Sequence, residues 1–385
     1  MTTTARSLVL AAKAANDAHD FRRGAELARQ AVALDPTQGY IIAELAHSLT
    51  HRHDYWLNPA FEKQLVADGT LAEAVRLYER AFELGHHCEF SRLCCGHALT
   101  SLGRTAEAAR HLRVATDIRA LQVHPELKGS YEAAPVRGPD FLIVGTTKAG
   151  TTSLYEYMCQ HPRVLPAIWK EPEYYLFPER GMDWYLSHFP RTPDRPARFV
   201  TGEASSCYLS IWNAKDLIHA SFPAARLFVL LRDPVDKAIS HCHHDRKIGR
   251  EQRTVDQALN EELDILEPRP DPFHGAEEYW RTQSGYVWLG LYAYMLENWF
   301  SKFPREQMLV VQSEQFWREP GPIMDQAFAH VGLPAHALGN YPVHLEGKYD
   351  KSKPEPVRVR LQRFFARHND RLFDLVGRRF DWQQP

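Results

Sequence analysis

Two runs of consecutive apolar residues predict buried β-strands. The first run covers residues 141–144 and the second covers residues 227–231. Strands of a parallel sheet covered on both faces are apolar throughout, without alternation, and both runs have this character. The first run leads into a segment where Leu154, Tyr157 and Met158 recur at helical spacing. The pattern therefore predicts an α/β domain in which a parallel sheet is flanked by helices.

The chain before residue 123 shows a different pattern, in which small and turn-forming residues recur. The matching positions are His19, Gly24 and Ala31, then Gly69, Ala74 and Ala81, then Gly103, Ala108 and Ala115. The offsets are 50 and 34 residues, and 34 residues is the tetratricopeptide period. The longer offset equals one period plus a 16-residue insertion, which we place around residues 51–68. A further small residue, Ala12, Ala46 or Gly96, lies in the preceding helix of each unit.

Small residues of this kind let paired helices approach closely, and stacked pairs bury surface that one pair cannot. Residues 1–122 therefore resemble a tetratricopeptide-like helical repeat domain, with three units and an interrupted second unit. An alanine-rich helical bundle is the alternative. A repeat domain offers an interaction surface, so we expect a protein partner or homo-oligomer there. Residues 123–138 are rich in proline, glycine and charge, and predict a linker to a second domain at residues 139–385.

Composition narrows the function classes. The formal net charge of −2 argues against a general nucleic-acid binder. The sequence contains no run of about 18 apolar residues, so we expect no membrane span. The N-terminus has a short apolar stretch without a clear cleavage site, which predicts a helix rather than a signal peptide. The six cysteines are scattered without a CxxC pair, which predicts free thiols and a cytoplasmic protein. His86, His87 and Cys88 lack a matching second cluster, so we predict no metal site.

The segment after the first strand has the chemistry of a phosphate-binding loop. Gly145 and Gly150 permit a tight turn, and residues 151–153 can cap the following helix. Backbone N–H groups at such a helix start attract a phosphate. Nucleoside-triphosphate loops place a lysine directly after the last glycine, whereas Lys148 lies two residues before Gly150. The displaced lysine argues against a nucleotide kinase; an ordinary strand, turn and helix is the alternative for this segment alone.

The second strand ends in a similar design. Arg232 follows it directly, at the edge where open α/β sheets bind ligands. Pro234 can begin the next helix, and Ser240 lies about two turns into it. A guanidinium group can hold two phosphate oxygens at once, which suits Arg232 to a phosphate. The alternative for Arg232 is an ion pair with Asp233 or Asp236.

These two elements resemble those of the PAPS-dependent sulfotransferases, where PAPS is 3′-phosphoadenosine 5′-phosphosulfate. The resemblance covers residues 139–382 and is nearest to the branch of the heparan sulfate sulfotransferases and their bacterial relatives. Four segments carry it: LLRDPVDKAISH at 230–241, KEPEYYLF at 170–177, residues 290–316 and residues 349–365. It implies the sulfotransferase fold, a P-loop-like parallel sheet flanked by helices.

The resemblance also implies how the nucleotide is bound. Lys148 then lies near the bridging oxygen of the phosphosulfate, and Arg232 and Ser240 hold the 3′-phosphate. The 5′-phosphosulfate loop comprises Lys148, Ala149, Gly150, Thr151, Thr152 and Ser153, and Lys351 and Lys353 are further phosphate contacts. The product is adenosine 3′,5′-bisphosphate. The sulfate end carries one charge, so no metal is required.

The same resemblance assigns the general base to Glu171. Its neighbour Lys170 would orient the sulfate or adjust the carboxylate. An exposed lysine–glutamate pair without a catalytic role is the alternative. Five other residues are competing bases: Glu203, His188, His241, His243 and His244.

The acceptor is not readable from the sequence. The branch has a lysine where this chain has Ala204, so its polysaccharide acceptor does not carry over. The candidates are a small metabolite, a carrier-bound acyl chain, a saccharide and a protein. Two other functions compete with the sulfotransferase: a nucleotide-dependent kinase of the P-loop fold group, and a non-catalytic repeat scaffold. Retention of Lys148, Arg232 and Ser240 argues against the scaffold.

Overall fold

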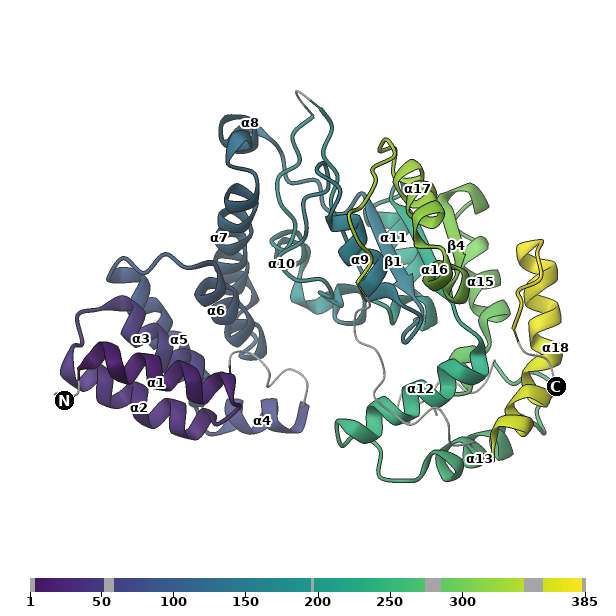
Figure 1. The fold of residues 1–385 in the computed structure, drawn as a ribbon, viewed down its shortest axis with the longest axis horizontal. Helices are drawn as coiled ribbons and strands as arrows, with labels where there is room; N and C mark the ends of the chain where they lie inside the picture. Colours follow the sequence, from purple (N-terminus) through teal and green to yellow (C-terminus); the bar gives the residue numbers. More distant parts are fainter. Residues whose placement is uncertain (1–3, 52–58, 195–196, 274–284, 343–355, 383–385) are drawn as a thin grey trace. The chain divides into compact units, whose positions relative to one another are not determined.

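The computed structural model describes the chain except residues 1–3, 52–58, 195–196, 274–284, 343–355 and 383–385 (Figure 1). The chain divides into two compact units. The first comprises residues 1–138, 166–169 and 177–198, and the second comprises residues 139–165, 170–176 and 199–385. The units therefore alternate along the chain between residues 166 and 198, whereas the sequence pattern predicts one linker before residue 139.

The first unit is helical. Its N-terminal helices are α1 (Ala5–Asp17), α2 (Phe21–Leu34), α3 (Gly39–Leu49), α4 (Pro59–Ala67), α5 (Thr70–Glu83), α6 (Glu89–Ser101) and α7 (Thr105–Val123). Three hairpins, α1 with α2, α3 with α5 and α6 with α7, lie side by side (Figure 1). The helix–helix contacts are lined by fully buried alanines: Ala12, Ala28, Ala31, Ala46, Ala74, Ala81, Ala108 and Ala115.

The turn positions that the sequence pattern aligned share one backbone conformation. His19, Gly69 and Gly103 have φ angles of 61°, 80° and 73°, and each precedes the second helix of its hairpin. The segment expected to be an insertion contains α4, which packs on α5. The three hairpins therefore share one turn conformation. That they form a tetratricopeptide-like repeat stays a prediction.

The segment expected to be a linker is partly helical and anchored. It contains the short helical turn η2 (Pro125–Leu127) and α8 (Lys128–Ala133). Tyr131 is buried, and its hydroxyl donates a hydrogen bond of 2.8 Å to Asp117. The aromatic ring fastens the segment to α7, a packing role that proline and glycine content does not reveal.

A later part of the chain joins the first unit through α10 (Met182–Leu186). The buried Trp184 donates to the Thr100 hydroxyl at 2.8 Å, and Thr116 donates to the Ser187 carbonyl at 2.8 Å. The helical turn η4 (Pro178–Arg180) precedes α10. These contacts explain why residues 177–198 belong to the helical unit.

The second unit is built on a parallel sheet of four strands, in the order β2-β1-β3-β4. The strands are β1 (Phe141–Gly145), β2 (Gly202–Glu203), β3 (Arg226–Leu231) and β4 (Met308–Gln312). Leu142 pairs with Leu227, and Leu227 pairs with Met308, all in parallel. Both apolar runs are strands, and their buried side chains confirm the predicted α/β class.

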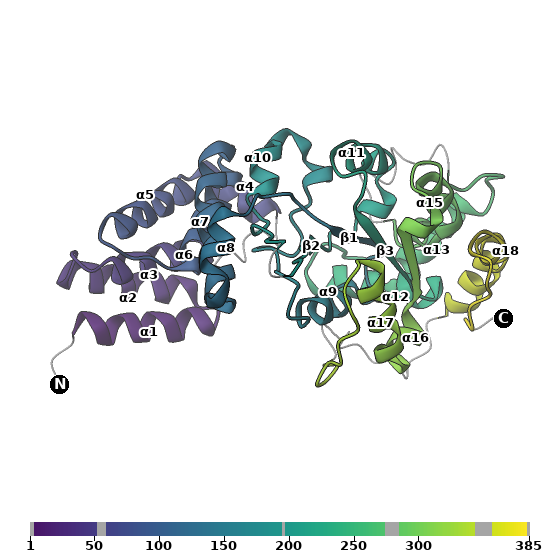
Figure 2. The ribbon, with the colours of Figure 1, turned by 90° about the horizontal axis from the view of Figure 1, so that it is seen from above.

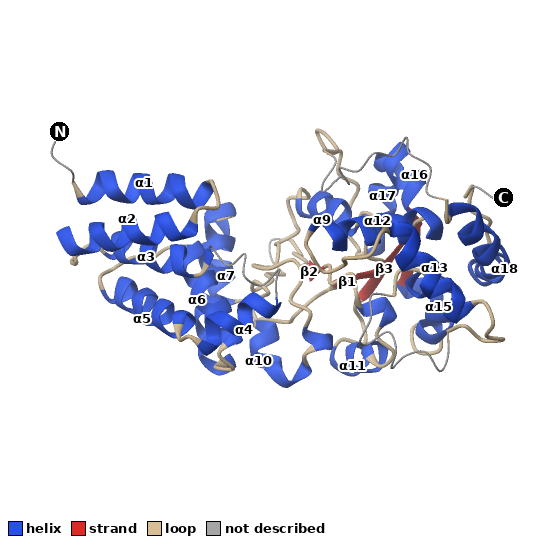
Figure 3. Cartoon of the chain, turned by 90° about the horizontal axis from the view of Figure 1, so that it is seen from below, coloured by secondary structure: helices blue, strands red, loops and turns tan. Residues whose placement is uncertain are grey.

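Helices cover both faces of this sheet. Helices α9 (Thr151–Cys159) and α17 (Pro320–His330) lie on one face, and α11 (Ala214–Ser221) and α15 (Tyr292–Phe300) lie on the other (Figures 2 and 3). The turn η5 (Tyr208–Ser210) packs between β1 and the second pair. Leu154 and Met158 of α9 share one buried core with Phe228 and Phe328.

The second unit contains seven further described elements. They are η3 (Tyr174–Leu176), α12 (Pro234–Lys247), α13 (Val255–Leu266), η6 (Trp288–Gly290), η7 (Arg305–Gln307), α16 (Ser313–Arg318) and α18 (Arg358–Val376). Helix α18 packs on α12 and α15. Among the described helices, none has both the length and the apolar character to cross a membrane. All six cysteines are free thiols.

Candidate active site

The loop between β1 and α9 is anchored from two sides. The Thr146 N–H and hydroxyl both donate to the Leu230 carbonyl, at 2.9 and 3.1 Å, which ties the loop to β3. The Ser313 hydroxyl donates to the Ala149 carbonyl at 2.7 Å. Lys148 and Gly150 have φ angles of 68° and 95°, so the chain makes the tight turn that the glycine predicts. The first N–H groups of α9, which have no partner within the helix, lie at the end of this loop.

The structure brings Arg232 to this loop. Arg232 Nη1 donates to the Lys148 carbonyl oxygen at 3.1 Å, across 84 residues of sequence. The Arg232 carbonyl accepts a bond of 3.0 Å from the Tyr292 hydroxyl. Because β1 and β3 are parallel neighbours, the segments at their carboxyl ends meet at one edge of the sheet.

Asp233 and Asp236, the alternative ion-pair partners of Arg232, bind other groups. Asp233 Oδ1 accepts from the Val235 N–H at 2.9 Å and caps α12, and Asp236 pairs with Arg358 at 2.7 Å. Ser240 is buried on the same helix, two turns further along. Arg232 is therefore held by a backbone carbonyl rather than by a neighbouring carboxylate.

The loop carries one cation, Lys148, and Arg232 adds a second beside it. Burial lowers the pKa of the Lys148 ammonium, and the nearby Arg232 guanidinium lowers it further. The positive charges of Lys148 and Arg232 repel each other in this half-buried site. An anionic ligand offsets this repulsion, so the two side chains are suited to bind one.

Lys170 and Glu171 also meet the loop. Lys170 Nζ forms an ion pair with Glu171 Oε1 and donates to the Thr152 hydroxyl at 2.7 Å. The Lys170 carbonyl accepts from the Ala204 N–H at 2.8 Å, which fixes the segment against the end of β2. The Lys170 and Glu171 side chains are 21% and 34% exposed, so the pair is half-buried rather than a solvated surface pair.

Glu203 differs from Glu171 in its burial and in its hydrogen-bond partners. It is fully buried, and it accepts hydrogen bonds from the Ser205 and Tyr208 hydroxyl groups. Burial raises the pKa of the Cys207 thiol, and the charges of Glu173, Glu171 and Glu203 raise it further. All three carboxylates therefore act on the Cys207 thiol through their charge, and Glu171 pairs with Lys170.

Burial disfavours the charged form of three of the histidines considered as bases. His188 lies in the first unit, where burial lowers its pKa to about 4 and its Nδ1 faces the Trp184 carbonyl at 2.9 Å. Burial also lowers the pKa of His241 well below the ordinary value, and Lys237 adds to the effect. Partial burial lowers the pKa of His244, and the charge of Lys148 lowers it further. His243 is half-buried on the same helix.

Sequence reasoning did not identify the contribution of α16. Ser313 holds the loop, and Glu314 Oε1 accepts from the Asp233 N–H at 2.9 Å. Their position directly after an apolar strand was the available signal, since ligands bind at the carboxyl ends of such strands. Lys351 and Lys353 lie outside the described residues. Within the described part of the chain, no group of three histidine, cysteine or acidic residues could hold a metal ion.

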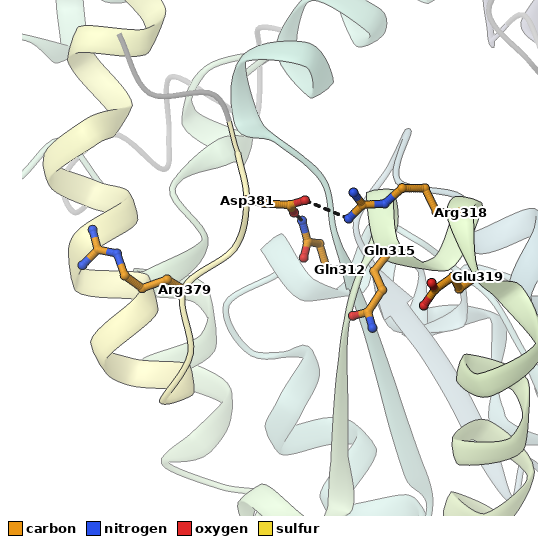
Figure 4. Close-up of a pocket in the computed structure, with 6 residues that line it drawn as sticks. All are labelled: Gln312, Gln315, Arg318, Glu319, Arg379 and Asp381. Atoms are coloured by element: carbon orange, nitrogen blue, oxygen red, sulfur yellow. Dashed lines mark hydrogen bonds and ion pairs between the residues drawn. The ribbon is translucent and has the colours of Figure 1, made fainter.

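A cavity of about 400 Å³ lies at the carboxyl end of β4 (Figure 4). It is lined by Gln312, Gln315, Arg318, Glu319, Arg379 and Asp381, and Asp381 bridges Gln312 and Arg318. None of the residues predicted to bind phosphate lines it. Arg318 and Asp381 pair with each other, and Arg379 pairs with Asp370 outside the lining. We assign the candidate site to the phosphate loop instead.

The chain is similar to several known proteins. The model of the sulfotransferase domain matches residues 138–354. Human heparan sulfate glucosamine 3-O-sulfotransferase 6 is 31% identical over 272 residues, which cover 64% of this chain and 74% of the relative. Membrane-associated sulfotransferase kil1 of Dictyostelium discoideum is 23% identical, covering 65% of this chain and 68% of the relative. The crystal structure of a sulfotransferase from Alicyclobacillus acidocaldarius is 27% identical with a TM-score of 0.51, covering 63% of this chain and 97% of that one.

Proposed function

The chain belongs to the sulfotransferase family, and from this premise we propose that it transfers a sulfuryl group from PAPS to a hydroxyl or amine group of an acceptor. Membership of this family favours a loop that binds PAPS over the two alternative functions, a nucleotide-dependent kinase and a non-catalytic repeat scaffold. The observation that carries the PAPS assignment is the hydrogen bond from Arg232 to the Lys148 carbonyl. Through this bond, a candidate phosphate-binding side chain adjoins the phosphate loop. This arrangement supports a single nucleotide that is bound through two phosphate groups.

In this proposal the loop and Arg232 bind different phosphate groups of one nucleotide. The N–H groups of residues 149–153 and the Lys148 ammonium bind the 5′-phosphosulfate, whereas Arg232 and Ser240 bind the 3′-phosphate. The mutual repulsion of Lys148 and Arg232 supports a polyanionic ligand. Lys351 and Lys353 are proposed as additional phosphate contacts.

The bound PAPS supplies a sulfuryl group that is already activated by its link to the 5′-phosphate. Transfer forms a bond from the acceptor oxygen or nitrogen to sulfur, and breaks the sulfur–oxygen bond to the phosphate. Glu171 takes the acceptor proton. Lys148 stabilises the charge that develops on the departing phosphate oxygen, and adenosine 3′,5′-bisphosphate is released.

Two observations support Glu171 over the other carboxylates and the histidines. Its carboxylate is partly exposed, whereas Glu203 is fully buried beneath two hydroxyl donors. Lys170 joins Glu171 to Thr152 in the first turn of α9, which keeps the carboxylate beside the phosphate loop. Lys170 is therefore proposed to orient both the base and the transferred sulfate.

The acceptor class is not assigned by the names of the relatives. A saccharide, as named for the human relative, is one of four candidates, with a small metabolite, a carrier-bound acyl chain and a protein. Ala204 is fully buried and lies where the heparan sulfate branch has a lysine. The helical unit is proposed to bind a protein partner or a second copy of the chain. The proposed cytoplasmic location rests on the six free thiols.

Isothermal titration with adenosine 3′,5′-bisphosphate and with ADP tests the nucleotide assignment. We expect the bisphosphate to bind without magnesium and more tightly than ADP, which lacks the 3′-phosphate. Arg232→Ala should abolish this preference, and Arg363→Ala, at an exposed arginine of α18, should leave it intact. Magnesium-dependent ATP binding without bisphosphate binding would instead favour the nucleotide-dependent kinase. A transfer screen with radiolabelled PAPS over the four acceptor classes then identifies the acceptor.

A further inference from the structure

Helix α16 contacts both candidate phosphate elements. At its first turn, the Ser313 hydroxyl binds the Ala149 carbonyl in the loop after β1. The next residue, Glu314, accepts from the N–H of Asp233, directly after Arg232. Two consecutive side chains of one short helix therefore join the loop after β1 to the segment after β3.

Trp317 lies one turn further along the same helix, on the face of Ser313. Its ring centroid is 5.2 Å from Arg232 Cζ, so the indole stands over the guanidinium. Its Nε1 would lie 3.0 Å from a Cβ atom at Gly150, so the same ring lies against the loop glycine. The indole thus contacts the candidate 3′-phosphate residue and the candidate 5′-phosphosulfate loop together.

This tryptophan is 47% exposed, although it is large and apolar. Its contact with Arg232 is of the kind in which an aromatic face attracts a cation. Arg232 Nη1 is already fixed by the Lys148 carbonyl, and the indole limits the motion of the guanidinium from a second direction. An arginine held in this way loses less side-chain entropy when it binds a phosphate.

We propose that Trp317 is a positioning residue that holds Arg232 ready for the 3′-phosphate of the nucleotide. The inference rests on the proposed function, because it presumes that Arg232 binds this phosphate. It assigns to Trp317 part of the preference for nucleotides with a 3′-phosphate. Trp317 acts through Arg232 and makes no contact with the reacting atoms in this assignment.

The test compares dissociation constants for adenosine 3′,5′-bisphosphate and adenosine 5′-phosphate in Trp317 variants. Trp317→Leu should weaken bisphosphate binding by about two- to fivefold, as an exposed cation–aromatic contact predicts, and leave 5′-phosphate binding unchanged. Trp317→Phe should restore most of the loss, since it keeps an aromatic face. In an Arg232→Ala background, Trp317→Leu should have no further effect.

Trp212→Leu is the matched control, because this tryptophan of the same unit is 45% exposed and packs against Phe273 and Lys215. It should change neither constant. If the wild-type protein prefers the bisphosphate and Trp317→Leu leaves that preference intact, the inference fails and the proposed function stands. Equal weakening of both nucleotides would also overturn the inference. If the wild-type protein binds neither nucleotide, both the proposed function and the inference fail.

Discussion

Lys170 Nζ donates a hydrogen bond of 2.7 Å to the hydroxyl of Thr152. The donor lies in an irregular segment and the acceptor in the first turn of α9, so the bond joins the proposed base to the proposed phosphate loop. Because Lys170 also pairs with Glu171, one ammonium group connects the two halves of the proposed chemistry.

Replacing Glu171 by glutamine should remove proton transfer without removing nucleotide binding. We expect Glu171→Gln to lower kcat by roughly 10²- to 10⁴-fold, the range for loss of a general base. Affinity for adenosine 3′,5′-bisphosphate, measured by titration calorimetry, should stay unchanged. Glu156→Gln, at an exposed carboxylate of α9, should leave both quantities unchanged. If Glu171→Gln kept the wild-type kcat, another residue would be the general base.

Lys148 should matter most when the phosphate leaves. Lys148→Met should lower kcat by roughly 10²- to 10³-fold, as for the loss of one group that stabilises developing charge. Lys247→Met is the control, because Lys247 is exposed and acts on Lys148 by charge repulsion. It should change kcat by less than about threefold, since exposed charges are screened by salt. Single-turnover kinetics with radiolabelled PAPS separates this effect from product release.

Asp233 should make stability depend on pH. Burial raises its pKa to about 6, and Asp236 and Glu314 contribute. Between about pH 4 and 6 the folded chain keeps a proton that the unfolded chain has lost, so the free energy of unfolding falls as pH rises. Asp233→Asn keeps the cap oxygen and removes the titration. Its stability relative to wild type should therefore rise over this window by at most about 3 kcal/mol and then level off.

Chemical denaturation at a series of pH values between 4 and 7 measures this difference. Asp325→Asn, at an exposed aspartate of α17, should show a difference that does not vary with pH. A constant difference for Asp233→Asn would show that the carboxyl group titrates at its ordinary pKa in the folded protein.

The helical unit should be sensitive to the size of Gly24. A Cβ atom there would lie 2.0 Å from Asn16 Oδ1, inside a buried cluster in which Asn16 donates to Glu44 and Ser48. Gly24→Ala should therefore lower the free energy of unfolding by about 1–3 kcal/mol, despite the higher helix propensity of alanine.

Gly129 in α8 provides the opposite case. No atom lies within 4 Å of a Cβ built there, so Gly129→Ala should be neutral or stabilising by up to about 1 kcal/mol. Chemical denaturation of the two variants compares them directly. If Gly24→Ala were as stable as wild type, close packing at the repeat position would not be the reason for its glycine.

Much of the fold could be predicted because its signals are local. The apolar runs specified β1 and β3, and glycines beside hydroxyl residues specified the turn into α9. The recurring small residues located the helical hairpins, whose turn residues share a left-handed backbone. The attachment of residues 177–198 to the helical unit was not predictable, because it depends on hydrogen bonds such as Trp184 to Thr100 across 84 residues.

The sequence by itself determined the α/β class and the residue types of the candidate site, since a phosphate loop is encoded within a few consecutive residues. Tertiary structure alone decided that Lys148 and Arg232 adjoin, because parallel pairing of β1 and β3 sets their carboxyl ends side by side. It also decided that Lys170 bonds to Thr152 and that Trp317 stands over Arg232. These contacts join segments distant in the chain, so the packing of strands and helices, rather than local residue pattern, brings them together.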